Sequence, residues 1–217
     1  MHKTRSSAVL LYSIRIQLTN GLGASALTFI SLPKIKGFVE KTLGEYDMII
    51  ERCKEVFLAK TADYGTAWRI LRLPSLTDQL YIKASRIRSI EEKGVQKVGD
   101  SIENEFIGLV NYSLISLIQL SLTEEDPIDL PLEKARALYE KEAGLTRDLL
   151  AAKNHDYDEV WRELRVSSFT DIILMKLRRI KQIEDNQGKT LMSEGLDGNY
   201  RDILNYAVFA LIMMKEK

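Results

Sequence analysis

The segment KTADYGTAWRILRLPSLTD, residues 60–78, returns later in the chain as KNHDYDEVWRELRVSSFTD, residues 153–171. The opening lysine, the Asp-Tyr and Trp-Arg pairs and the closing Thr-Asp recur in the same order and at the same spacing. A sequence that repeats at a fixed offset is typical of a supersecondary unit present more than once. This stretch therefore predicts one structural unit that occurs twice in the chain.

Each copy of the unit is expected to contain three helices. Residues 39–61 and 132–154 are rich in Glu, Lys, Leu and Ala at helical spacing, and a third helix is expected over roughly 101–122 and 199–215. The second helix of each copy lies between them. Alternating β-branched residues, the signature of strands, are scarce. We therefore expect an all-α fold with two tandem three-helix repeats packed as a pseudo-symmetric helical bundle.

The start of the second helix carries its own signal. Ser75 and Ser168 stand three residues before Asp78 and Asp171. This is the spacing of an N-terminal capping box, in which the serine and the acidic residue satisfy free backbone N–H groups. The pattern predicts that the second helix begins at the serine in both copies.

The repeats also predict the domain organisation. Residues 38–122 form repeat 1, residues 132–217 form repeat 2, and the twice-prolined segment 123–131 links them. Residues 1–37 have no counterpart in either repeat, and Arg15 interrupts their apolar run. We expect this segment to be either a flexible arm or the result of a start codon assigned too early. The basic start MHKTR leaves a secretory signal as a further alternative.

Composition limits the classes of partner. The 217 residues are 45% apolar and 29% charged, with a formal net charge of zero. Such a chain has no overall field to attract nucleic acid polymers or an anionic membrane, so neither is expected as a partner, whereas a homodimer is compatible with this composition. Cys53 is the single cysteine, which excludes an internal disulfide and a cysteine-rich zinc site and favours the reducing cytoplasm.

Charged residues of the second helix fall on its apolar side. Lys83, Lys176 and Glu184 lie within about 60° of the apolar stripe, and Arg86 and Arg179 lie at its edge. A charge on an inward face costs several kcal/mol unless it is paired or solvated. These positions therefore need either ion-pair partners or a polar pocket.

The third helix repeats this pattern. Asn205 shares a stripe with Phe209, and Asp202 lies on the same side of the helix. In the first copy Asn111 matches Asn205, but Gly108 stands in the place of Asp202. A purely structural network would need both halves satisfied, whereas a duplicated binding site can lose one half. The difference at Gly108 therefore favours a functional role.

Two interpretations of these charges remain open. In one, they form a buried salt-bridge network that fixes helix register. In the other, lysine and arginine hold phosphates while Glu184, Glu194 and Asp202 hold a divalent cation, because carboxylates suit Mg²⁺. Trp161 also has two interpretations, as a core residue or as a platform on which a base stacks.

Three segments of the second copy resemble a known family. KNHDYDEVW, LMKLRRIKQIED and SEGLDGNYRDILNYAVFALI are similar to the nucleotide modification associated domain, in its tandem-copy Bacteroidetes form. The family pattern is matched at Lys153, Asp156, Tyr157, Lys176, Arg179, Glu194, Asp202, Asn205 and Tyr206. It is not matched at Asp158, where glycine is usual. The acidic pattern also resembles the MazG-like all-α nucleoside triphosphate pyrophosphatases, although their paired Glu-x-x-Glu is missing here.

The resemblance implies a nucleotide-binding protein of nucleotide metabolism or modification. The residues expected to bind the nucleotide are Lys176, Arg179, Asn205, Tyr206, Asp156, Tyr157, Trp161, Lys83, Arg86 and Asn111. The catalytic and metal-binding residues would be Glu184, Glu194 and Asp202, with Mg²⁺ as cofactor. A catalytic member would hydrolyse a nucleoside triphosphate to release pyrophosphate. The alternative is a non-catalytic helical scaffold or a regulatory binding module.

Overall fold

The computed structural model describes residues 32–97, 99–157, 159–192 and 194–216, without the side chains of residues 32–40 and 154–157. This part of the chain contains six α-helices, two 3₁₀ helices and no strand. The elements are α2 (Leu32–Tyr64), η1 (Ala67–Ile70), α3 (Leu73–Lys93), α4 (Ile102–Ser121), α5 (Leu132–Tyr157), η2 (Val160–Glu163), α6 (Val166–Asp185) and α7 (Leu196–Lys215). The predicted all-α fold with two three-helix repeats is confirmed.

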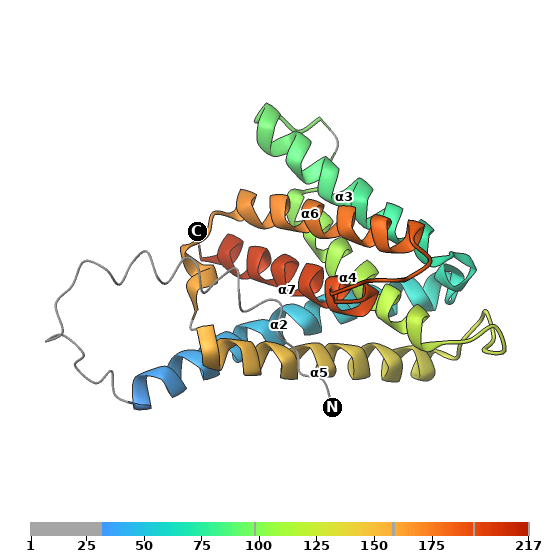
Figure 1. Ribbon diagram of the computed structural model, residues 1–217, viewed down its shortest axis with the longest axis horizontal. Coiled ribbons are helices and arrows are strands. Elements are labelled where there is room, and N and C mark those ends of the chain that lie inside the picture. The colour runs from blue at the N-terminus through green and yellow to red at the C-terminus, as the bar shows by residue number, and fades with distance from the viewer. Residues whose placement is uncertain (1–31, 98, 158, 193, 217) are drawn as a thin grey trace, which may run out of the picture.

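The helices form three layers, each with one helix from either repeat. Figure 1 shows α3 and α6 along one side, α4 and α7 through the middle, and α2 and α5 along the opposite side. α4 and α7 pack against each other and against helices of both outer layers. The two repeats are therefore interleaved around a common centre.

The central helices explain why the core is shared. α4 and α7 bury apolar side chains on more than one face, as expected for helices that are covered on several sides. The buried residues of both repeats form one continuous hydrophobic cluster. Neither repeat has a separate core, so the two halves stabilise each other in the manner of an internal dimer.

Two kinds of buried polar contact join the repeats, and each of these two kinds occurs once in either direction. The four hydrogen bonds are Thr77 to Glu184 (2.7 Å), Thr170 to Glu91 (3.1 Å), Tyr139 to Asn111 (2.8 Å) and Tyr46 to Asn205 (3.3 Å). Thr77 and Thr170 belong to the repeated Ser-x-Thr-Asp segments. The repetition of these segments is thus explained by the interface between the repeats, where a buried hydroxyl needs a partner.

The predicted capping box is wrong. α3 begins at Leu73 and α6 at Val166, so both serines lie inside the first turn, and neither helix has a side-chain cap. Pro74 occupies the first turn of α3, where its missing N–H costs nothing. The aspartates instead form ion pairs between the repeats: Asp78 pairs with Lys181 at 2.7 Å and Asp171 with Arg88 at 3.7 Å.

The N-terminal prediction lies largely outside the described residues. Residues 1–31 are not described, and the backbone of α2 begins at Leu32, before the predicted start of repeat 1 at residue 38. None of the described helices is long and apolar enough to cross a membrane.

Candidate functional site

Three helices of the second repeat converge on Asp202. Lys176 of α6 donates to Oδ2 of this carboxylate at 2.5 Å, and Lys153 of α5 donates to Oδ1 at 3.0 Å. Lys176 is only 8% exposed, and the side chain of Asp202 is 13% exposed. Two ammonium groups therefore share one nearly buried carboxylate, which we call the Asp202 cluster.

The helical pattern explains how a lysine reaches this place. Lys176 lies on the face of α6 that buries Ile173, Leu177 and Ile180, as the sequence predicted. Its long apolar stem packs along that face while the ammonium reaches a polar partner. Arg179, one turn later, is exposed. Arg179 could therefore contact a ligand that sits above the cluster, but it is not part of the buried network.

Glu194 and Tyr206 complete the Asp202 cluster. The Glu194 side chain lies against Gly198, where an added Cβ would be 3.0 Å from the Glu194 Cβ. Burial lowers the pKa of Lys153, but the charge and hydrogen bond of Asp202, with help from Glu194, outweigh it and raise this pKa overall. Burial, followed by the charge of Asp202, raises the pKa of Tyr206. Two cations and two carboxylates thus act on one another at this point.

Glu184 lies elsewhere, at the interface between the repeats. Its carboxylate accepts hydrogen bonds from Thr77 of α3 (2.7 Å) and Tyr200 of α7 (3.5 Å). Burial raises the pKa of Glu184, and these hydrogen bonds oppose that rise only in part. Helical periodicity showed correctly that Glu184 faces inward. Periodicity could not show that the inward face of α6 packs against both α7 and α3, or that Glu184 lies on the α3 side.

The three predicted magnesium ligands are therefore not assembled. In the described part of the chain, no group of three or more His, Cys, Asp and Glu side chains is arranged to hold a metal ion. Asp202 is already neutralised by two lysines, and Glu194 lies beside it. Mg²⁺ often takes one or two protein carboxylates and completes its shell with phosphates and waters. Asp202 and Glu194 could hold Mg²⁺ in this way only if the phosphates of a ligand bind the two lysines in place of Asp202.

The first repeat holds a related but altered cluster. Lys83 lies 3.3 Å from the carboxylate of Glu105, and Arg86 pairs with the same carboxylate. Glu105 aligns with Asn199, so the acidic group has moved one helical turn from the place of Asp202. Lys83 fills the space this leaves, because a Cβ on Gly108 would come within 2.8 Å of its side chain. Sequence reasoning missed Glu105, although a glutamate three residues before Gly108 shares its face of the helix.

The remaining predicted residues have mostly structural surroundings. Asn111 accepts from Tyr139 and donates to the Cys53 carbonyl at 3.0 Å, and Asn205 accepts from Tyr46. The Trp161 ring stacks on Phe209, with centroids 4.3 Å apart, and the Arg162 guanidinium lies over it. Its ring is thus engaged within the protein. Asp156 and Tyr157 fall in the last turn of α5, and their side chains lie outside the described residues.

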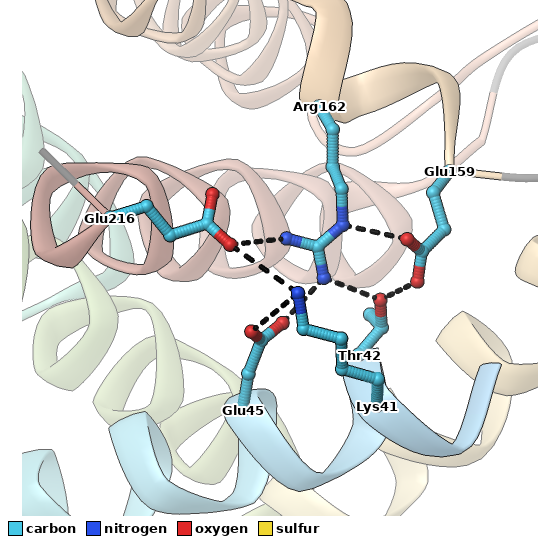
Figure 2. A network of polar contacts seen from close by, with 6 residues as sticks. All are labelled: Lys41, Thr42, Glu45, Glu159, Arg162 and Glu216. Atoms are coloured by element: carbon cyan, nitrogen blue, oxygen red, sulfur yellow. Dashed lines mark hydrogen bonds and ion pairs between the residues drawn. The ribbon is translucent and has the colours of Figure 1, made fainter. Parts of the chain in front are cut away.

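A second polar network, which the sequence did not reveal, surrounds Arg162 (Figure 2). Arg162 follows the repeated tryptophan and binds Glu159 at 2.6 Å, Glu216 at 3.0 Å and, on α2 of the first repeat, Glu45. Its counterpart Arg69 instead donates to backbone carbonyls of the linker, those of residues 123, 126 and 127. Both arginines therefore fasten the loop after the first helix to a segment of the other repeat or of the linker.

Comparison with known proteins bears on the Asp202 cluster. No curated protein and no solved structure is significantly similar to the chain. The model of one protein family, nucleotide modification associated domain 1, matches it twice, over residues 60–120 and 153–214. The two matches begin at the repeated lysines, Lys60 and Lys153, and together cover more than half of the sequence. The chain belongs to the nucleotide modification associated domain 1 family, of which it contains two tandem copies.

Proposed function

We propose that the chain binds a nucleotide at the Asp202 cluster of its second repeat, through the phosphate groups. The observation that carries this proposal is the convergence of Lys153 and Lys176 on one carboxylate. Both ammonium groups point at the same carboxylate, so an anionic ligand that displaces Asp202 meets two cations at once. The family description, which associates the domain with nucleotide modification, supports a phosphate as that anion.

Binding would exchange partners within the cluster. A lysine ammonium is a compact charge with three donors, which suits it to phosphate oxygens. When phosphates take the two lysines, Asp202 and Glu194 lose their nearest cations. Arg179 is exposed one turn from Lys176 and would provide an additional contact to phosphate. The ligand thus replaces the carboxylate as the partner of a buried lysine, and Lys176 is never left unpaired.

Hydrolysis is the finer proposal for the same site. Asp202 and Glu194 would hold Mg²⁺ together with the phosphates, and the ion would polarise a phosphate oxygen and neutralise charge that develops on it. In this chain the role of Lys176 and Lys153 would be to orient the phosphates. Glu184 would take no part, because it lies with Thr77 at the repeat interface.

A non-catalytic scaffold or regulatory module is the second candidate. It is favoured by the first-repeat cluster, where Lys83 closes onto Gly108 and Glu105 and the charges serve packing. If the same interpretation applies to the second repeat, the ion pair of Lys176 with Asp202 only fixes the register of α6 against α7. This candidate and nucleotide binding differ in whether added nucleotide stabilises the folded chain.

Thermal denaturation with a panel of nucleotides, with and without Mg²⁺, tests the proposal. A ligand at 100 times its Kd adds about 2.7 kcal/mol, which corresponds to a rise in Tm of about 5–10 °C for a chain of this size. Lys176→Met should abolish the shift, and Arg178→Met, an exposed arginine on the same helix, should keep it. No shift with any nucleotide, or a full shift in Lys176→Met, would overturn the proposal.

Pyrophosphate release separates the enzyme from the binding module. Asp202→Ala should abolish release from a nucleoside triphosphate, whereas Asp100→Ala, at the position that matches Glu194 in the first repeat, should not. A nucleotide that stabilises the wild-type chain without any pyrophosphate release identifies a binding module.

A further inference from the structure

A shallow hollow lies on the surface between α5 and α7. Its volume is about 390 Å³, and it is lined by Leu145, Asp148, Leu149, Ala152 and Arg201. Leu145 and Leu149 are 45% and 47% exposed, and with Ala152 they follow the i, i+4, i+7 spacing of one helical face. The lining of the hollow is therefore mainly apolar, and Asp148 and Arg201 are its two charged residues.

The hollow adjoins the Asp202 cluster on both of its helices. Leu149 lies one helical turn before Lys153 on the same face of α5, and Arg201 directly precedes Asp202 on α7. A ligand whose anionic end contacts Lys153 therefore has its remaining part within reach of the leucines. The volume lies within the range of about 300–1,000 Å³ that is usual for small-molecule sites.

Arg201 gives the hollow a fixed wall. Its guanidinium donates to Thr146 Oγ1 at 2.7 Å and to Glu142 Oε2 at 2.7 Å, and both partners are buried. A guanidinium held by two such bonds keeps its plane, and planar guanidinium groups stack on nucleobases. The part of Arg201 that lines the hollow is thus a rigid surface.

We propose that this hollow receives the nucleobase of the ligand whose phosphates bind Lys153 and Lys176. The inference rests on the proposed function, because the phosphates determine which end of the ligand enters. A second copy of the chain is a less suitable occupant, since a stable interface buries about 800 Å² on each partner and two half-exposed leucines offer far less. An aromatic heterocycle of a single nucleotide matches both the apolar lining and the neighbouring cations.

Calorimetric titration of the full chain with a nucleoside triphosphate and with inorganic triphosphate tests this inference. The nucleoside triphosphate should bind about tenfold more tightly, because it alone has a base to bury against the leucines and Arg201. Leu149→Gln should remove most of this advantage and leave the affinity for inorganic triphosphate unchanged. The matched control is Leu132→Gln, another exposed leucine at the far end of α5, which should change neither affinity.

The possible outcomes separate the two proposals. Equal affinity for both ligands, or an unchanged nucleotide affinity in Leu149→Gln, overturns the base site and leaves phosphate binding intact. Failure of both ligands to bind the wild-type chain overturns the proposed function and the base site with it. If Leu149→Gln converts a dimer to a monomer in sedimentation without an effect on nucleotide affinity, the hollow is a self-association surface and the inference is wrong.

Discussion

Replacing Arg162 with alanine is expected to destabilise the fold strongly without touching the Asp202 cluster. Arg162 bridges Glu45, Glu159 and Glu216, and the first two carboxylates and the arginine itself are each less than 20% exposed. Removing one member of a buried ion pair costs about 3–5 kcal/mol, because the partner charge is left desolvated. Lys41 also contacts Glu45 and Glu216 and would compensate in part, so the lower end, about 3 kcal/mol, applies.

Arg69→Ala provides the matched control, because Arg69 holds the equivalent place in the first repeat. Its acceptors are neutral linker carbonyls and the Gln119 amide oxygen, which leave no charge behind, so we expect a loss of only about 1–2 kcal/mol. Urea denaturation of both variants gives the two free energies, and the Tm of Arg162→Ala should fall by about 6–12 °C. A loss below about 0.5 kcal/mol for Arg162→Ala, or a larger loss for Arg69→Ala, would refute the reasoning.

Three further predictions follow from buried groups and from the difference between the repeats. Because burial raises the pKa of Glu184, its ionisation in the folded state costs stability, and this cost grows as pH rises from about 4.3 through the raised value. Glu184→Gln should therefore gain stability over wild type as pH rises from about 4 to about 7 in urea titrations, and a difference that does not change with pH would contradict the buried placement. Burial raises the pKa of Cys53 to about 12, so its thiol should react with a disulfide reagent only at the rate of unfolding, and a fast reaction in the native state would contradict the buried placement. Gly108→Asp combined with Glu105→Asn gives the first repeat the acidic residue of the second at the matching position. This double variant should raise the number of nucleotides bound per chain in calorimetry from one towards two. An unchanged number would show that the position of the carboxylate does not decide binding.

The architecture could be predicted because the chain contains two similar repeats, which can be compared with each other. Two copies of one pattern, whose offset differs by only one residue between the second helix and the third, identified the three-helix unit and its tandem arrangement before any contact was known. Periodicity also placed Lys176 and Glu184 on the inward face of α6. Periodicity is reliable here because side chains at i, i+3 and i+4 of a helix lie on one face whatever the helix packs against.

The partners of the inward charges could not be predicted in the same way. Helical phase states which way a side chain points but not which helix it meets, and α6 faces both α7 and α3. Lys176 meets Asp202 on α7, while Glu184 meets Thr77 on α3. The predicted starts of α3 and α6 were wrong for a related reason. A Ser-x-x-Asp segment can cap a helix, but here its aspartate forms an ion pair with the opposite repeat. Contacts between the repeats were the missing information in both cases.

The comparison of the two clusters separates structural need from a binding role. A buried lysine on the second helix needs a carboxylate in either repeat, so the pairs of Lys83 with Glu105 and of Lys176 with Asp202 are explained by the cost of an unpaired charge. That cost does not explain why Lys153 also reaches Asp202, because Lys153 is partly exposed and water could solvate it. Within the described residues, no ion pair involves Lys60, its counterpart in the first repeat. The first repeat also puts a second cation on its carboxylate, but that cation, Arg86, comes from the same helix as Lys83. An ammonium from the first helix of the repeat is thus the feature that packing leaves unexplained in the second copy, and it is the feature that a phosphate would use.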